Sequence, residues 1–246
     1  MLPATESASL AEGAYLVLRE RILKGELAPG ASLSRRKLAI ELGMSMLPVA
    51  EALQRLEGDG LVESRPRVGT QVLLPSAAGV RERFEVREAL EAQAARLFAE
   101  KASAREKAEL LKMAGNMDAM YERRAGGESD PDFLFSVQSY HAQLHLRIAE
   151  CTGCRSLRQT IEKNHLLIFT WLYDVAAHQP ALPSHHHIRL LEELSTGDVE
   201  RADSAMREHI RCGREVILHA LETKSQRAPQ PIQVKGNVVA RAGIKP

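Results

Sequence analysis

Between residues 31 and 72, the spacing of apolar and polar positions changes from one typical of helices to one typical of strands. Two short runs have the three-to-four-residue spacing of helices, and the positions after them alternate as strands do. Ser34 can cap the first helix, and Gly43 follows that helix where a left-handed C-cap is required. Ser45 can cap the second helix, whose apolar face contains Val49, Leu53 and Leu56. The chain therefore predicts two helices separated by a tight turn.

Two strands are predicted after these helices, at residues 61–64 and 70–73, with the loop 65–69 between them. A helix-turn-helix followed by such a hairpin wing is a DNA-binding unit, and its second helix enters the major groove. An amphipathic helix at residues 11–24 is expected to pack against this unit. The residues expected at the DNA are Arg35, Arg36, Lys37, Ser45, Met46, Leu47, Ala50, Arg65, Arg67 and Gly69.

The remainder of the chain has helical spacing almost throughout. Helices are predicted within residues 81–101, 103–124, 132–151, 156–177, 184–196 and 199–222. The expected fold class is mainly α, with an N-terminal winged helix-turn-helix plus a C-terminal all-α antiparallel helical bundle. The predicted domains are residues 10–74 and 80–222, joined by a small, polar linker at 74–79. Residues 223–246 are rich in Pro, Gln, Lys and Arg and are predicted to be disordered.

The composition gives no overall attraction to nucleic acid or membranes. The chain has 33 Lys and Arg against 32 Asp and Glu, a net charge of +1, and its hydrophobic content of 44% is ordinary for a globular protein. Affinity for DNA must therefore come from the cations placed near the helix-turn-helix and wing. No stretch is long enough to span a bilayer, so a soluble, cytoplasmic protein is expected.

Four stretches carry a family resemblance in the N-terminal part. They are RERILKGELAPGASLS at 19–34, LAxxLGxS at 38–45, PVxEALxRLExxGLVE at 48–63 and a wing that ends in Gly69. Together they resemble the DNA-binding domain of GntR-type transcriptional regulators. The family usually has Arg just after the Ser that begins the second helix and again after the Pro-Val pair, where this chain has Met46 and Ala50. We therefore expect a loss of the usual preference for guanine, because Arg is its commonest reader. The expected result is an operator richer in A·T pairs, or weak DNA binding that depends on the dimer and the effector state. The alternative is a regulator that is losing its DNA binding.

Four further stretches resemble the FCD ligand-binding domain that accompanies such N-terminal domains in the FadR-like subgroup. They are EVREALEAQAARLFAE at 85–100, HLRIAECTGC at 145–154, HIRLLEEL at 187–194 and GDVERADSAMREHI at 197–210. The resemblance implies that a small organic acid is the effector. Arg87 is a candidate for holding its carboxylate, since guanidinium pairs with carboxylate through two hydrogen bonds. The alternative is an exposed helix charge that pairs with Glu91.

All nine histidines lie after residue 140, and four of them are predicted to point into the bundle interior. His141 and His145 are four residues apart and share a helix face. His187 and His209 lie on the apolar faces of two later helices. Buried imidazoles without partners cost free energy, and a shared divalent metal is the simplest partner. Hydrogen-bonded core histidines without metal are the alternative. His185 and His186 are predicted to be solvated, because helix neighbours point about 100° apart.

The FCD resemblance implies a metal site of one Asp, a His four residues later, and two further His. His145, His187 and His209 match the three histidines, and His141 stands where the family usually has Asp. An all-imidazole site favours zinc or nickel, as well as copper or cobalt, over manganese or magnesium. It also neutralises less of the metal's charge, which favours an anionic ligand at an open coordination position.

The leading interpretation is a homodimeric transcriptional regulator that binds an inverted-repeat operator and responds to a small organic acid. Dimerisation is expected because one recognition helix covers too few base pairs for specificity. Two alternatives use the same histidines. One is a metal-dependent hydrolase, which requires a carboxylate base that Glu150 and Glu192 do not supply at their helical phase. The other is a metal sensor in which the ion itself is the effector. The sequence favours a regulator that is not an enzyme.

Overall fold

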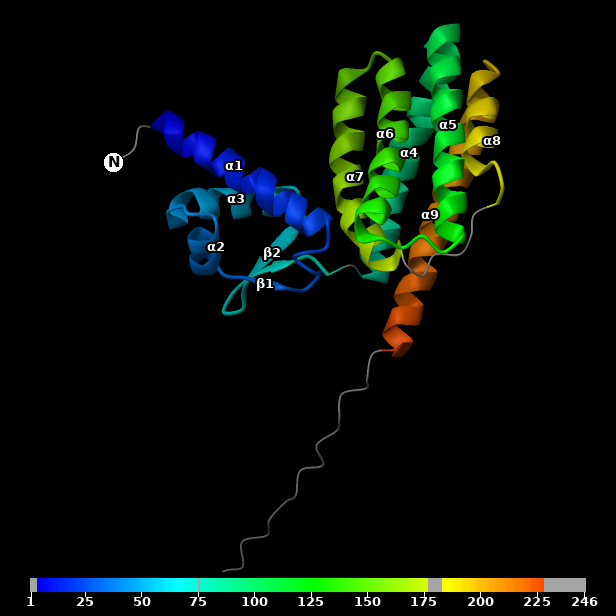
Figure 1. The fold of residues 1–246 in the computed structure, drawn as a ribbon. Coiled ribbons are helices and arrows are strands. Elements are labelled where there is room, and N and C mark those ends of the chain that lie inside the picture. Colours follow the sequence, from blue (N-terminus) through cyan, green and yellow to red (C-terminus); the bar gives the residue numbers. More distant parts are fainter. Residues whose placement is uncertain (1–3, 75, 177–182, 228–246) are drawn as a thin grey trace, which may run out of the picture.

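A computed structural model describes residues 4–74, 76–176 and 183–227 of the chain, with side chains described for 10–74, 76–165 and 183–223. The described part is mainly helical (Figure 1), with a group of helices and a small sheet followed by a helical bundle. This arrangement confirms the predicted fold class. No described helix has both the length and the apolar character that a membrane span requires.

The N-terminal group surrounds a three-stranded antiparallel sheet with strand order β1-β3-β2. Its elements are α1 (Ala4–Leu23), β1 (Ser32–Leu33), α2 (Arg35–Glu41), α3 (Met46–Gly58), β2 (Val62–Arg65) and β3 (Gly69–Val72). The helices and the sheet share one apolar core, which includes Leu18, Val49, Leu53, Leu56 and Leu61. The two-residue strand β1 was not predicted.

The ends of the two short helices show how local residues set this unit. Ser34 caps α2 as predicted, because its hydroxyl accepts a hydrogen bond from the Lys37 amide. Gly43 adopts a positive φ of 64°, as the predicted C-cap requires. Ser45 occupies the N-cap position of α3, but its side chain makes no capping hydrogen bond. The Ser45 hydroxyl therefore contributes less to the start of α3 than the sequence suggested.

The C-terminal bundle contains α4 (Ala77–Lys101), α5 (Ala104–Ala125), α6 (Pro131–Cys151), α7 (Arg155–Ala176), α8 (His186–Ser195) and α9 (Val199–Arg227). Two boundaries differ from the prediction by more than two residues. Residues 77–79 of the expected linker begin α4, where the Ser76 hydroxyl accepts a hydrogen bond from the Gly79 amide. Helix α9 continues five residues past Glu222 to Arg227, and residues 228–246 of the expected tail lie outside the described residues.

Helix α4 is the central element of the bundle and packs against α6, α7, α8 and α9. Its buried face is mostly apolar and includes Phe84, Ala95 and Phe98. Two charged residues, Arg87 and Glu91, lie on the same buried face. A charge in such surroundings requires a partner, so this part of α4 determines where polar groups of the neighbouring helices gather.

Candidate functional site

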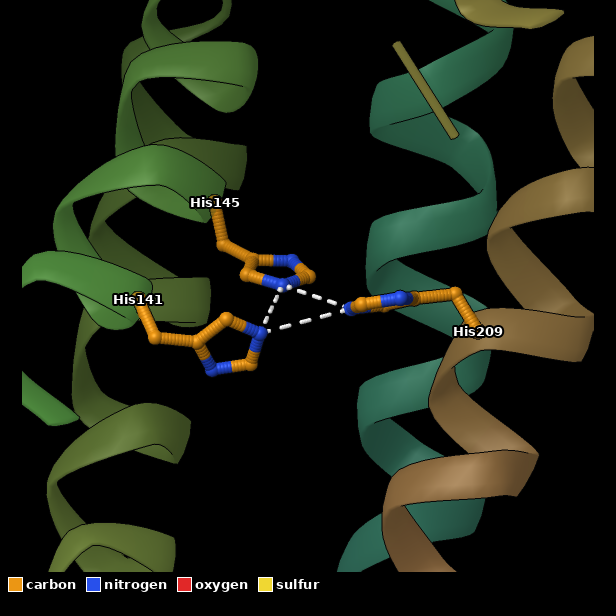
Figure 2. Close-up of side chains that lie close together, drawn as sticks. All are labelled: His141, His145 and His209. Atoms are coloured by element: carbon orange, nitrogen blue, oxygen red, sulfur yellow. Dashed lines mark hydrogen bonds between the residues drawn. The ribbon is translucent and has the colours of Figure 1, made fainter. Parts of the chain in front are cut away.

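The bundle brings four predicted histidines together from three helices. His141 and His145 come from α6, His187 from α8 and His209 from α9. The Nε2 atom of His145 lies 3.1 Å from that of His141 and 3.1 Å from that of His209, and the last two are 3.4 Å apart (Figure 2). The ring centroid of His187 lies 5.2 Å from that of His141 and 5.3 Å from that of His209. We call these four residues the histidine cluster.

Glu91 is the hydrogen-bond acceptor that orients His145. Its carboxylate accepts hydrogen bonds from His145 Nδ1, from Arg87 Nε at 2.6 Å and from His165 Nε2 at 2.7 Å. Burial alone would raise the pKa of Glu91, but Arg87, His145 and His165 together hold this pKa well below its usual value. The carboxylate is therefore ionised, and His145 must donate its Nδ1 proton, which leaves Nε2 as a lone pair that faces the histidine cluster.

Asp118 of α5 has the corresponding role for His187. One carboxylate oxygen accepts hydrogen bonds from His187 Nδ1 at 2.7 Å and from the His187 amide at 3.0 Å, and the other accepts the Ile188 amide at 3.0 Å. These bonds outweigh the effect of burial and lower the pKa of Asp118. Asp118 thus also caps α8, whose N-cap residue His185 makes no side-chain capping bond.

The donor set fits a divalent metal. The buried Nε2 atom of His187 has no hydrogen-bond partner among the described residues, although its tautomer makes it an acceptor. Tetrahedral zinc–nitrogen bonds of about 2.0–2.1 Å place two ligand nitrogens about 3.3 Å apart. The separations among His141, His145 and His209 agree with this spacing. A single proton between three converging nitrogens can join only two of them, whereas a metal ion accepts a lone pair from each.

The cluster is also in the protonation state that metal ligation requires. Burial is the largest cause that lowers the pKa of His141 and His209 well below the usual value, and it lowers that of His145 to about 4. The three imidazoles are therefore neutral at pH 7. Neutral imidazole is the form of histidine that binds a divalent metal.

One prediction about the adjacent histidines was wrong. His186 was expected to be solvated, but it is half-buried and its Nε2 atom lies 3.0 Å from Nδ1 of His209. The angle of about 100° between helix neighbours does turn His186 away from the direction of His187. In this bundle that direction leads to α9, which packs beside α8. His185 is exposed, as predicted.

Arg87 lies at the cluster but is not an exposed charge. Its side chain is 4% exposed, pairs with Glu91 as the alternative proposed, and places Nη2 3.5 Å from His145 Nε2. Tyr121 of α5 was not predicted, and its ring centroid lies 5.2 Å from that of His187. A cavity of about 50 Å³ beside it is lined by Asp118, Tyr121, Glu122, Ala125, Pro183, Ser184 and His185.

Sequence reasoning missed Glu91, Asp118 and His165 as members of the site. A usable signal existed for Glu91, because Arg87 and Glu91 are four residues apart on the apolar face of one helix. Asp118 and His165 carry no comparable signal in their own helices. Glu150 and Glu192 are exposed, so neither is a carboxylate base for the cluster, in agreement with their helical phase.

The predicted DNA-reading residues lie in the helix-turn-helix and the wing. The three cations at the start of α2 are exposed, and Arg65 of the wing pairs with Glu63 at 2.8 Å. Met46 and Leu47 begin α3 with 59% and 61% of their surface exposed, and Ala50 is half-buried. Arg67 has a positive φ of 66° within the wing turn, where Val68 donates a backbone hydrogen bond to Arg65. Gly69 follows with a φ of 94°.

Comparison with protein families assigns both parts of the chain. The model "Bacterial regulatory proteins, gntR family" matches residues 10–72, and the FCD domain model matches residues 82–211. These ranges cover the helix-turn-helix with its wing and most of the helical bundle.

Individual relatives agree with this assignment. The chain is 30% identical over 200 residues to an HTH-type transcriptional regulator in an unstable DNA locus of Streptomyces ambofaciens, which covers 80% of each chain. It is 26% identical over 200 residues to the HTH-type transcriptional repressor RspR of Escherichia coli, covering 80% of this chain and 83% of RspR. The structure of E. coli McbR/YncC shares the fold, with a TM-score of 0.67 at 23% identity over 90% of this chain and 100% of that one. The chain therefore belongs to the GntR family of transcriptional regulators, in the FadR-like subgroup that joins a DNA-binding helix-turn-helix domain to an FCD effector domain and that contains regulators rather than enzymes.

Proposed function

We propose that this regulator binds a divalent transition metal, zinc or nickel, through His141, His145, His187 and His209. The observation that carries the proposal is the buried Nε2 atom of His187, an unpartnered lone pair on a ring whose centroid lies 5.2 Å from that of His141 and 5.3 Å from that of His209. The Nε2 atoms of His141, His145 and His209 converge beside this ring. Four imidazoles form a donor set of the kind that zinc and nickel prefer to manganese or magnesium. The bound ion would supply a positive charge in the interior of the bundle.

We infer that the effector is a small organic acid that binds near this ion. Imidazoles bind a divalent metal in their neutral form, so four such ligands do not offset the charge of the ion. Arg87 adds a further positive charge 3.5 Å from His145 Nε2. Glu91 and Asp118 offset part of this charge, but they bind the Nδ1 atoms of His145 and His187, and the proposed metal ligands are the Nε2 atoms. A carboxylate effector would complete the charge balance, with Arg87 as its candidate partner.

For the DNA-binding part, we propose a homodimer that reads an inverted repeat. The unit at residues 10–74 has one recognition helix, α3, which spans too few base pairs for specificity in a genome. The effector unit at residues 80–222 would then control the spacing of the two recognition helices. Arg35, Arg36, Lys37, Arg65 and Arg67 are proposed to hold phosphates, since exposed cations in these positions suit the DNA backbone.

The proposed operator is richer in A·T pairs than is usual for the family. Met46 and Leu47 present exposed apolar surface at the start of α3, and Ala50 is small and half-buried. Apolar side chains match the methyl group of thymine, whereas Arg would have read guanine. Ser45 and Gly69 complete the proposed contact set, as a hydroxyl and as a close backbone approach.

The metal proposal is tested on protein purified without a histidine tag after growth with zinc and nickel. Elemental analysis should find about one transition metal per chain. The double variant His187→Ala, His209→Ala should lose it while it retains its helical circular dichroism. Less than a tenth of an equivalent in the unmodified chain would contradict the proposal.

The DNA proposal is tested by selection from random duplexes, with and without zinc. Enrichment of an inverted repeat rich in A·T pairs is the expected result. A motif with guanines at the positions that the family's Arg residues read would refute the interpretation of Met46 and Ala50. Enrichment of a single half-site by a monomeric protein would refute the dimeric arrangement.

A further inference from the structure

We propose that His186 is a positioning residue for the metal, which holds His209 in the tautomer that ligation requires. The Nε2 atom of His186 lies 3.0 Å from Nδ1 of His209, and the two rings stack with centroids 4.9 Å apart. The inference rests on the proposed function, because it concerns a ligand of the same metal. Nothing in the family pattern of one Asp and three His includes this residue.

The ring nitrogen that carries the proton decides which nitrogen of a histidine can bind a metal. A histidine that ligates a metal through Nε2 must keep its proton on Nδ1, and a hydrogen-bond acceptor at Nδ1 fixes that arrangement. His145 has Glu91 as its acceptor, and His187 has Asp118. His209 Nδ1 faces no carboxylate among the described residues, and its partner there is His186.

The Nε2 atom of His209 determines which ring donates in the hydrogen bond between His209 and His186. If His209 carried its proton on Nε2, that proton would point at His141 and His145, 3.4 Å and 3.1 Å away. A metal could not then bind His209 through Nε2. In the metal-bound protein His209 therefore donates its Nδ1 proton, and His186 accepts it through Nε2.

His186 differs from the other two acceptors because it is a neutral ring at the start of a helix. It occupies the first position of α8, directly after His185, which has a positive φ of 58°. Its backbone position therefore depends on the cap that Asp118 provides to α8. His186, the acceptor for His209, is thus held in place by Asp118, the acceptor for His187.

Three substitutions separate the hydrogen bond from packing and charge. His186→Phe keeps an aromatic ring against His209 but removes the acceptor. His186→Ala removes both. His186→Asp restores an acceptor of the same type that His145 and His187 already have. His185→Ala is the control, because His185 is the exposed neighbour on the same turn.

The assay is zinc affinity of the full, untagged chain, measured by competition with a chromophoric chelator. Loss of an orienting partner typically weakens metal binding by about 10- to 100-fold. We expect this loss in His186→Phe and His186→Ala, recovery to within about threefold of wild type in His186→Asp, and no change in His185→Ala. Each variant should still bind one equivalent with an unchanged cobalt(II) absorption spectrum, since the ligand set is the same.

A second readout follows the proton itself. In the zinc-loaded wild type, long-range ¹H–¹⁵N spectra should show His209 protonated at Nδ1, with a downfield proton that disappears in His186→Phe. Wild-type zinc affinity in His186→Phe would overturn the inference. So would a changed cobalt(II) spectrum in His186→Ala, because His186 would then be a direct ligand. If the wild-type chain binds no metal, both the proposed function and this inference fail. If the wild-type chain binds zinc and His186→Phe binds it equally well, only this inference fails.

Discussion

Replacement of Asp118 by Asn tests two roles of one carboxylate. Asp118 accepts three hydrogen bonds, two from backbone amides at the start of α8 and one from His187 Nδ1. Asn retains one acceptor oxygen, and its NH₂ group faces a donor. Loss of a helix cap costs about 0.5–2 kcal/mol, and loss of a hydrogen bond to a charged group costs about 1.5–3 kcal/mol. We expect the free energy of unfolding of the metal-free chain to fall by about 2–5 kcal/mol.

The same substitution should weaken zinc binding by about 10- to 100-fold, because His187 loses the partner that fixes its tautomer. Urea denaturation in the presence of a chelator measures the first effect, and chelator competition measures the second. Asp130→Asn is the matched control. Asp130 caps α6 by accepting the Asp132 and Phe133 amides at 3.0 and 3.1 Å, and neither of these two bonds involves a histidine.

The control should keep wild-type zinc affinity and nearly all of its stability, because Asn caps a helix about as well as Asp and retains the one oxygen that accepts both amides. If Asp118→Asn lowers stability but binds zinc as tightly as Asp130→Asn, Asp118 is only a cap and the argument from the His187 tautomer is wrong. If Asp118→Asn changes neither the stability nor the zinc affinity, the hydrogen bonds of Asp118 to His187 and Ile188 contribute to neither.

Three further predictions concern the charges and the DNA surface. Glu91→Gln should lower the free energy of unfolding by about 3–5 kcal/mol in urea denaturation, because buried Arg87 is left without its countercharge; a loss below about 1 kcal/mol would contradict this. The metal-free chain should lose stability as the pH falls from 7 to 4, because the pKa of His145 is lowered to about 4 and the unfolded chain takes up its proton first; a urea midpoint that is constant over this range would refute it. Met46→Arg with Ala50→Arg should shift the selected operator toward guanine and steepen the salt dependence of binding, with Glu51→Arg as a charge-matched control; an unchanged motif would count against the proposed reading surface.

The helices of both parts could be predicted because each carries its own apolar stripe and its own end signals. Ser34 and Gly43 act locally, so the sequence was sufficient for α2. Strand β1 could not be predicted, because two residues carry no period and Ser32 and Leu33 are held by pairing with β3.

The four-histidine convergence could be inferred because helical phase places each ring on an inward face. The partners of those rings could not, because they depend on how helices pack. Asp118 reaches α8 from α5, and His165 reaches Glu91 from α7. His186 shows the limit of reasoning from one helix: its angular offset from His187 is real, but only the position of α9 decides what that direction contains.

The exposed apolar side chains at the start of α3 also affect the heat of operator binding. Removal of apolar surface from water lowers the heat capacity, whereas the release of counterions from phosphates contributes mainly to salt dependence. Met46 and Leu47, if they are buried against thymine methyl groups, would therefore give association a negative heat-capacity change. The enthalpy of binding would become more favourable as the temperature rises. Such a regulator would depend more on growth temperature, and less on ionic strength, than a relative that reads guanine through arginine.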